Sequence, residues 1–587
     1  MIKFPSTIFE YVKREEVNYE NPIPIFDGYE WGMRTHLKES LCYKLSQFID
    51  GNPNHLKPFK NIVRPILNLQ YRTEGFDVKD IELYVDEAKN YFKSFLIRKY
   101  HERWARQEGI DTFIDELVES YVDFGGALIK DVNGARPEVV PLQSIAFCDQ
   151  TDMLSGPIGF KHFFSPSELK KMEKRGWKQI DELITLANFS KKNAPTESKT
   201  TGKYVEVYEV HGDFPESYLD DKKNDEDYET QIHIVAFYYN EDGKKNGITL
   251  FSSKEKALPF KLIKRDPVRG RALGFGGVEE LFDPQLWTNY SEVQKKNMLD
   301  AASKIIHITT DELFFQRFKP RNMENNEVAF LGEGKDVKQL DTFPRNIGLF
   351  EKSLTEWENH AQRMASATDP LLGESPTSGT PFRLQERVVI EGKGIHDYRR
   401  GKIATFMDEI YRDWIIPKLA KNIVTEQEFL ASLDLDELQE IADALVTCEA
   451  NKLIKDRVLS AQVVRPEEVD DFKNKVREAF MKGGNKRFLK ILEGEFKGVS
   501  LDVKTNIAGK QKYLAQQVDK LTNVFRTIVS APQVLDDPRM SKLFNEILEG
   551  SGLSPIDFGG SYAKPQMPQQ QMPQLPINRP EALPVPA

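Results

Sequence analysis

The chain has few cysteines and no sign of a membrane segment. Three cysteines occur in 587 residues, and no two of them form a CxxC pair. This predicts a chain without a disulfide framework, in a reducing compartment. No run of about 18 apolar residues occurs, and the first residues contain no apolar stretch of signal-peptide length. We therefore expect a soluble, intracellular protein.

The common catalytic motifs are missing as well. There is no GxxxxGK[ST] to anchor a nucleotide, no HExxH or GxSxG, and the nine histidines are scattered. We expect no catalytic residue, no metal and no cofactor, and a protein that is not an enzyme. One alternative stays open, because Asp149 and Asp152 have the spacing of a carboxylate pair in a metal-dependent nuclease. Their turn-like surroundings favour a structural role.

Charge and composition suit a large globular chain. The hydrophobic fraction is 40%, the charged fraction is 29% and the net charge is -10. An acidic surface opposes tight binding to nucleic-acid phosphates, although DNA can still slide past it. The length predicts roughly three to five structural units.

The first 264 residues mix helix and strand. Helical periodicity extends over 78–106 and 110–122, and Asn133-Gly134 predicts a β-hairpin within 127–142. Ser165-Pro-Ser-Glu168 is a capping box, which predicts that a helix begins there. A polar hinge at 190–203 precedes β-rich segments at 204–214, 232–240, 248–253 and 259–264.

The last 200 residues are mainly helical. A helix over 382–419 is expected to end at Pro417 or just beyond, and Thr425 begins a second capping box. One strand is expected at 499–507, followed by helices at 511–528 and 537–549. The tail from Lys564 is rich in Pro, Gln and Met and nearly uncharged, which predicts a disordered or partner-wrapped segment.

The central region is the most unusual part of the chain. The glycine-rich knuckle Gly274-Phe-Gly-Gly277 precedes a helix over 278–303, a partly β insert over 304–348 and a second helix over 349–368. A loop of small residues, 372–381, follows. The knuckle is too weak a motif for a phosphate cradle and predicts a tight turn into a closely packed helix. Such a hairpin suits a spoke that packs beside copies of itself in a ring.

The first of these helices has one flaw and one broad apolar face. Pro284 suggests that the helix restarts there, with Asp283 as its N-cap. Trp287 and Tyr290 could stack on bases, but they share a face with other apolar residues. That face predicts packing between subunits. It comprises Val278, Leu281, Phe282, Leu286, Trp287, Tyr290 and Val293.

The ordered set of segments resembles the portal proteins of tailed bacteriophages. The likeness rests on Asp149-Gln-Thr-Asp152 with the turn and helix start that follow, and on Arg269 to Asp283 leading into a long helix. It also rests on Ala367-Thr-Asp-Pro-Leu-Leu-Gly373 before a loop, and on Leu501 to Lys512 before a helix.

The resemblance implies a helix-rich α+β portal fold assembled as a ring, typically of twelve subunits. The parts it implies are an N-terminal arm (1–60), an α/β wing (61–274), two stem helices (275–302 and 349–371), a small clip between them (303–348), a tunnel loop with a long helix (372–424), a helical crown (425–559) and a disordered tail (560–587).

The implied function is a conduit in the virion, at one vertex of the capsid, assembled in the host cytoplasm. Double-stranded DNA passes through it during packaging and ejection, without sequence-specific binding. The implied partners are copies of the chain itself, the major capsid protein, the large terminase subunit and the neck or tail adaptors; no membrane is involved. The alternatives are another virion ring, adaptor or scaffold protein, or the nuclease above.

The resemblance also assigns residues to roles. The tunnel loop comprises Gly373, Glu374, Ser375, Pro376, Thr377, Ser378 and Gly379. The channel-lining residues are Glu292, Lys295, Lys296, Lys393, Arg399 and Arg400, although the last three could instead face an acidic stem of a neighbour. The docking residues on the clip are Phe314, Arg317, Lys319, Arg321 and Glu324.

Overall fold

The computed structural model of the chain describes residues 5–49, 57–78, 81–84, 91–132, 136–193, 205–219, 226–239, 245–303, 307–310, 333–339, 347–367, 369–372, 392–425, 443, 446, 447, 450, 451, 454, 455, 457, 468–478 and 502–505. The chain divides into two units, Met1–Tyr84 with Phe92–Lys510, and Val85–Tyr91 with Gln511–Ala587. Every described residue except Tyr91 belongs to the first unit. This unit is helix-rich α+β, as predicted. The helices expected at 511–528 and 537–549, and the proline-rich tail, lie outside the described residues.

A five-stranded antiparallel sheet has the order β10-β9-β8-β7-β6. It confirms the strands predicted at 204–214, 232–240 and 248–253. Alternate residues of each strand point to opposite sides of the sheet. Helices cover both of these sides. The strands are β6 (Ile145–Phe147), β7 (Ile158–Phe164), β8 (Val205–Pro215), β9 (Tyr228–Tyr239) and β10 (Lys245–Lys254).

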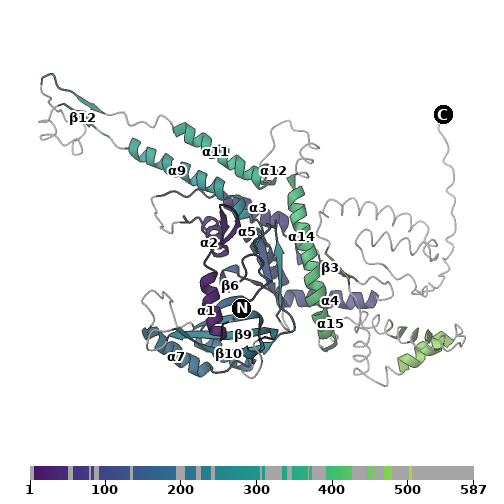
Figure 1. The fold of residues 1–587 in the computed structure, drawn as a ribbon. Coiled ribbons are helices and arrows are strands. Elements are labelled where there is room, and N and C mark those ends of the chain that lie inside the picture. The colour runs from purple at the N-terminus through teal and green to yellow at the C-terminus, as the bar shows by residue number, and fades with distance from the viewer. Residues whose placement is uncertain are drawn as a thin grey trace, which may run out of the picture. The chain divides into compact units, whose positions relative to one another are not determined.

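The two faces of this sheet have separate cores. Helix α1 (Ile8–Asn18) covers one face, where Tyr11 contacts Phe147 and Phe214 edge to face. Helices α6 (Pro166–Met172) and α7 (Ile180–Asn193) cover the other face (Figure 1). Ser165 caps α6 in the predicted capping box: its hydroxyl accepts from the Glu168 amide while the Glu168 carboxylate accepts from the Ser165 amide.

A three-stranded sheet, β11-β4-β5, lies against helix α5 (Ile110–Phe124). Strand β4 (Gly126–Lys130) pairs with β5 (Glu138–Val140), as the Asn-Gly hairpin signal predicted, and also with β11 (Phe260–Lys264). Gly125 ends α5 in the left-handed conformation, with φ 76°. This is a common way to end a helix, since glycine adopts positive φ without steric cost.

The prediction of one helix over 78–106 is partly wrong. Strand β3 (Ile81–Tyr84) lies in its first part and helix α4 (Tyr91–Glu108) in its last part, and residues 85–90 lie outside the described residues. The predicted strand at 499–507 is confirmed as β14 (Asp502–Thr505), and it pairs antiparallel with β3. The partner of β3 is some 400 residues away in the chain, so local periodicity could not reveal this strand.

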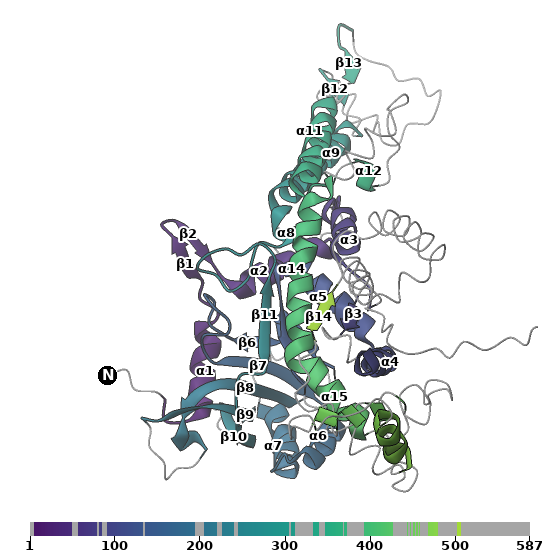
Figure 2. The same cartoon turned by 90° about the vertical axis from the view of Figure 1, so that its right-hand side faces the viewer.

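The predicted helical hairpin is confirmed. Helix α8 (Gly277–Glu280) and the long α9 (Phe282–Ala302) are joined at Leu281, and α9 packs against α11 (Ile347–Met364). Helix α9 is about 32 Å long at 1.5 Å per residue. At the far end of the hairpin, His307–Thr309 (β12) pairs with Val337–Gln339 (β13) (Figure 2). The expected N-cap is wrong: Leu281, not Asp283, occupies that position, without a side-chain cap.

The long helix after the hairpin continues beyond the end that its periodicity predicted and reaches the boundary that the resemblance implied, residue 424. Helix α14 (Gly394–Ile410) passes through a π-helical segment, Tyr411–Ile415, into α15 (Ile416–Thr425). The periodicity predicted an end at Pro417 or just beyond. Proline lacks the amide donor, and the wider π turn directly before it is the irregularity that accommodates it. The first part of the predicted helix, 382–391, lies outside the described residues.

The knuckle is a tight packing junction, as expected from its glycines. A Cβ on Gly276 would lie 2.6 Å from the Asp123 carbonyl oxygen and 2.9 Å from the Gly125 nitrogen, both rigid backbone atoms. We expect Gly276→Ala to lower the free energy of unfolding by about 1–3 kcal/mol through this overpacking, measured by denaturant unfolding. Gly401→Ala, in the middle of α14 with nothing within 4 Å of the added Cβ, is the control. Equal stability of the two variants would contradict the prediction.

Candidate functional site

A buried glutamate–arginine pair lies where the base of the hairpin meets α14. Glu74 is the last residue of α3 (Val63–Glu74), Arg265 follows β11, and both side chains are fully buried. The Arg265 Nη2 and Nε donate to the two Glu74 oxygens at 2.9 and 3.2 Å. The His396 Nδ1, from α14, lies 3.1 Å from the same carboxylate. Two facing donors and a ring nitrogen thus hold one carboxylate.

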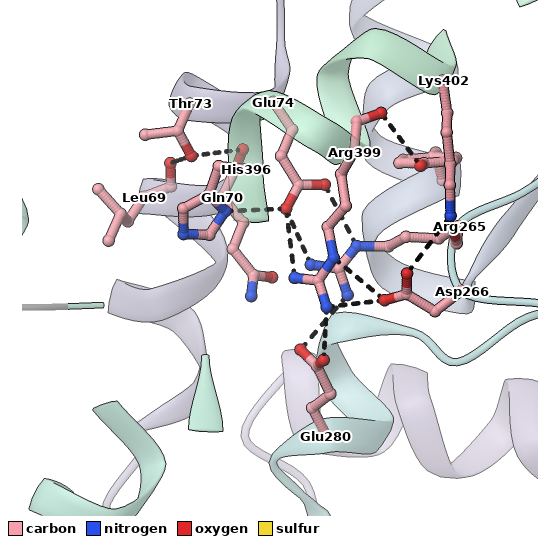
Figure 3. A network of polar contacts seen from close by, with 11 residues as sticks. Leu69, Gln70, Thr73, Glu74, Arg265, Asp266, Glu280, His396, Arg399 and Lys402 are labelled. Atoms are coloured by element: carbon pink, nitrogen blue, oxygen red, sulfur yellow. Dashed lines mark hydrogen bonds and ion pairs between the residues drawn. The ribbon is translucent and has the colours of Figure 1, made fainter. Parts of the chain in front are cut away.

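Arg399 extends this pair into a network. Its Nη2 donates to an Asp266 oxygen at 2.7 Å and to a Glu280 oxygen at 2.7 Å. Lys402, one turn further along α14, donates to the Arg265 carbonyl oxygen at 2.6 Å. Figure 3 shows these side chains converging from α3, from the segment that leads into α8, and from α14. The network therefore connects α14 to the base of the helical hairpin α9–α11.

Both members of the central pair are charged at neutral pH. Burial raises the pKa of Glu74, but the hydrogen bond from His396 and the guanidinium groups of Arg265 and Arg399 outweigh it, so its pKa lies below the usual value. Burial lowers the pKa of Arg265, but Glu74 and Glu280 more than compensate, and its pKa is raised. A buried charge whose partner is removed is strongly destabilising, so each member depends on the other.

A second buried arginine fixes the knuckle itself. Arg271 forms a fork with Glu279 at 2.8 and 2.6 Å and donates to the carbonyl oxygens of Leu273 and Gly274. Its guanidinium also lies 5.1 Å from the centre of the Trp31 ring. Two carbonyl groups at the beginning of the glycine-rich turn are thereby paired, and Glu279 of α8 is held in place.

Helix α9 buries a polar face. The Gln285 side-chain oxygen accepts from the Ile62 amide at 2.9 Å, and its nitrogen donates to the Lys60 carbonyl oxygen at 2.7 Å. Asn289, one turn later, accepts from the Lys60 amide at 3.2 Å. Gln285 and Asn289 thus bind the backbone of residues 60–62. Thr288 is buried beside them.

The opposite face of α9 is apolar and exposed. Leu286, Trp287 and Tyr290 are 52%, 46% and 54% exposed, respectively. Trp287 stacks on Trp357 of α11, with ring centres 6.0 Å apart and planes 7° from parallel. The predicted packing face is therefore divided. Val278 and Leu281 are buried within the chain, whereas the middle of the face is uncovered.

Of the predicted channel-lining residues, the structure buries Arg399 and leaves the other five half-buried or exposed. Lys295 is paired with Glu351 of α11 at 3.1 Å, and Lys296 with Asp300 at 2.5 Å. The prediction for Arg399 is wrong. Its side chain is 6% exposed and pairs with Asp266 and Glu280, so it does not line a channel. For Glu292, Lys295, Lys296, Lys393 and Arg400, which are half-buried or exposed, channel lining stays a prediction.

Other predicted site residues lie outside the described residues. They are the whole tunnel loop, Gly373, Glu374, Ser375, Pro376, Thr377, Ser378 and Gly379, and the docking set, Phe314, Arg317, Lys319, Arg321 and Glu324.

The carboxylate pair proposed for a nuclease is occupied by turn contacts. Asp149 accepts from the Thr151 amide at 2.7 Å and from the Ser155 hydroxyl at 3.0 Å. Burial raises the pKa of Asp149, but these hydrogen bonds outweigh it and lower that pKa. Within the described residues, no group of three or more His, Cys, Asp or Glu side chains could hold a metal ion. No helix of that part is long and apolar enough to cross a membrane.

The charge network was not predicted from sequence. Arg265 lies 191 residues after Glu74 in the chain, and His396 lies 322 residues after it. None of the three belongs to a recognisable motif. The sequence signal nearest to it is that Glu279 and Glu280 follow the knuckle by two and three residues, where they favour a helix start.

Comparisons with known proteins leave the family open. No family model and no curated protein matches the sequence. One similar solved structure is a chain of the virion of a native gene transfer agent particle. It is 11% identical, covers 74% of this chain and 93% of that chain, and has a TM-score of 0.28. Another is a chain of the neck of an empty gene transfer agent particle computed with C6 symmetry. That chain is 11% identical, and the match covers 91% of this chain and 96% of that chain with a TM-score of 0.32. Similarity at these TM-scores decides neither fold family nor function.

Proposed function

We propose that the chain is a portal protein: the subunit of a ring at one capsid vertex of a tailed-phage-like virion, through which double-stranded DNA is packaged and ejected. The observation that carries the proposal is the reversed polarity of α9. Its polar side chains are buried against the 60–62 backbone, while Leu286, Trp287 and Tyr290 are exposed. In an isolated chain these apolar side chains stay about half exposed to water, whereas neighbouring hairpins in a ring would bury them.

The neighbouring helix extends the same argument. Leu349 and Met364 on α11 are also exposed, at 66% and 42%. Apolar side chains on both helices of a projecting hairpin suit packing on both flanks, which a head-to-tail ring requires. The ordered sequence resemblance to portal proteins supports the same conclusion.

In this proposal the chain is a conduit and not an enzyme. The 303–348 segment docks the large terminase subunit and later the neck or tail adaptors, and the 372–382 loop contacts the moving DNA. The major capsid protein surrounds the ring in the virion. The charge network holds α14, which follows the loop, rigidly to the base of the hairpin.

The test is the mass and shape of the purified full-length chain. We expect light scattering to give a ring mass, typically twelve subunits, and negative-stain images to show an axial hole with a broad wing and a narrow stem. A chain that stays monomeric at high concentration would overturn the proposal. A ring without a projecting stem would favour an adaptor of the same kind of virion instead.

A further inference from the structure

The hairpin β1–β2 carries an uncovered aromatic pair at its tip. Strand β1 (Ile23–Phe26) pairs with β2 (Tyr29–Trp31) across the turn Asp27-Gly28, where Gly28 has φ 85°. The rings of Phe26 and Tyr29 stack with centres 5.0 Å apart, and Phe26 is 65% exposed. The base of the hairpin is anchored by buried Trp31, so the tip is presented on a fixed support.

Figure 2 shows this hairpin standing clear of the sheets, on the side of α2 (Met33–Lys44) away from α14. Asp27 and Glu30 flank the aromatic pair and are exposed. No ion pair of either residue is found among the described residues. The tip is thus an aromatic knob with two negative charges.

An apolar groove of about 310 Å³ lies beside α2. Leu37, Leu41 and Leu45 of α2 and the following turn line it together with Leu142 and Ile145. Neither Phe26 nor Tyr29 is among its lining residues, so the chain does not fill its own groove with its own knob.

The rim of the groove is basic. Arg34 and Lys38 lie one turn apart along it and are exposed. Arg34 is paired with Glu20, whereas no ion pair of Lys38 is found in the part of the chain that the structure describes. The groove therefore offers an apolar floor and one available cation, which complement the knob in polarity and charge.

We propose that the β1–β2 tip of one copy inserts into the α2 groove of the next copy, with Asp27 and Glu30 facing Lys38. The inference rests on the proposed ring and names a contact that builds it. Knob and groove are different surfaces of one chain, and repeating this contact from one copy to the next gives a head-to-tail interface, the kind that generates rings. The pairing of opposite charges sets the register, while the aromatic rings supply most of the buried area.

The native thiol of Cys42, which lines the groove, allows a direct test. In full-length Tyr29→Cys, a short bismaleimide should give a ladder of covalent multimers on denaturing gels. The ladder should disappear when Cys42→Ala is added. Intact rings that give no ladder, or a ladder that survives Cys42→Ala, would overturn this inference but leave the proposed function standing. A wild-type chain that forms no ring would overturn both.

Charge exchange provides an independent measurement. Asp27→Lys with Glu30→Lys, and separately Lys38→Glu, should each raise the concentration at which rings assemble by roughly threefold or more, as loss of interfacial ion pairs does. All three substitutions together should restore assembly to within about twofold of wild type, because the pair is re-formed with reversed signs. Unchanged assembly of the single-side variants, or no restoration in the combination, would count against the contact.

Discussion

Leu286→Asp with Tyr290→Asp is expected to convert the assembled ring into monomers. Both residues are about half exposed and lie one turn apart on α9. Removing an apolar anchor from the centre of an interface costs about 2 kcal/mol or more, and a buried unpaired carboxylate adds to this. Two such changes in each contact should weaken association at least about a thousandfold. Light scattering at a fixed protein concentration measures the result.

The matched control is Tyr228→Asp. Tyr228 begins β9 in the five-stranded sheet and is 54% exposed, the same fraction as Tyr290. The same substitution there should leave the ring intact. A full-sized ring in the Leu286→Asp, Tyr290→Asp variant would show that this face of α9 is not an interface. Monomers in both variants would show that added negative charge alone dissociates the ring.

Glu74→Ala is expected to lower the free energy of unfolding by about 3–5 kcal/mol, because it leaves Arg265 and His396 without their buried partner. Combining Glu74→Leu with Arg265→Met should recover much of this loss, since no unpaired charge of the central pair then stays buried. Denaturant unfolding at fixed protein concentration provides the measurement. A double variant as unstable as Glu74→Ala would contradict this explanation.

An exposed ion pair is the control for this effect. Glu356 lies 3.7 Å from Lys352 on α11, with both side chains largely exposed. Glu356→Ala should change stability by at most about 1 kcal/mol.

The pH dependence of stability follows from the lowered pKa of Glu74. The contribution of Glu74 to stability is present above the usual carboxyl pKa of 4.5, and it is lost as the pH falls through the lower pKa of the folded state.

Elements with strong local signals were predictable. The capping box at Ser165 and the paired strands around Asn133-Gly134 were expected, because each depends on neighbours a few residues away. The helices of the α9–α11 hairpin were expected from the periodicity within each helix. Strand β3 was missed, since the partner it has among the described residues, Asp502–Thr505, lies far away in the chain. The helix expected to end at Pro417 or just beyond continues to Thr425, because the π segment before the proline leaves no local sequence mark.

The sequence by itself determined which residues are apolar on α9 and that glycines must form the knuckle, since periodicity and Cβ size are local properties. Only the tertiary structure decided which face of α9 is covered, because Gln285 and Asn289 pair with backbone more than 220 residues away. It also moved Arg399 from an expected channel wall to a buried network with Asp266 and Glu280. Burial depends on contacts between distant segments, and no window of sequence contains both partners.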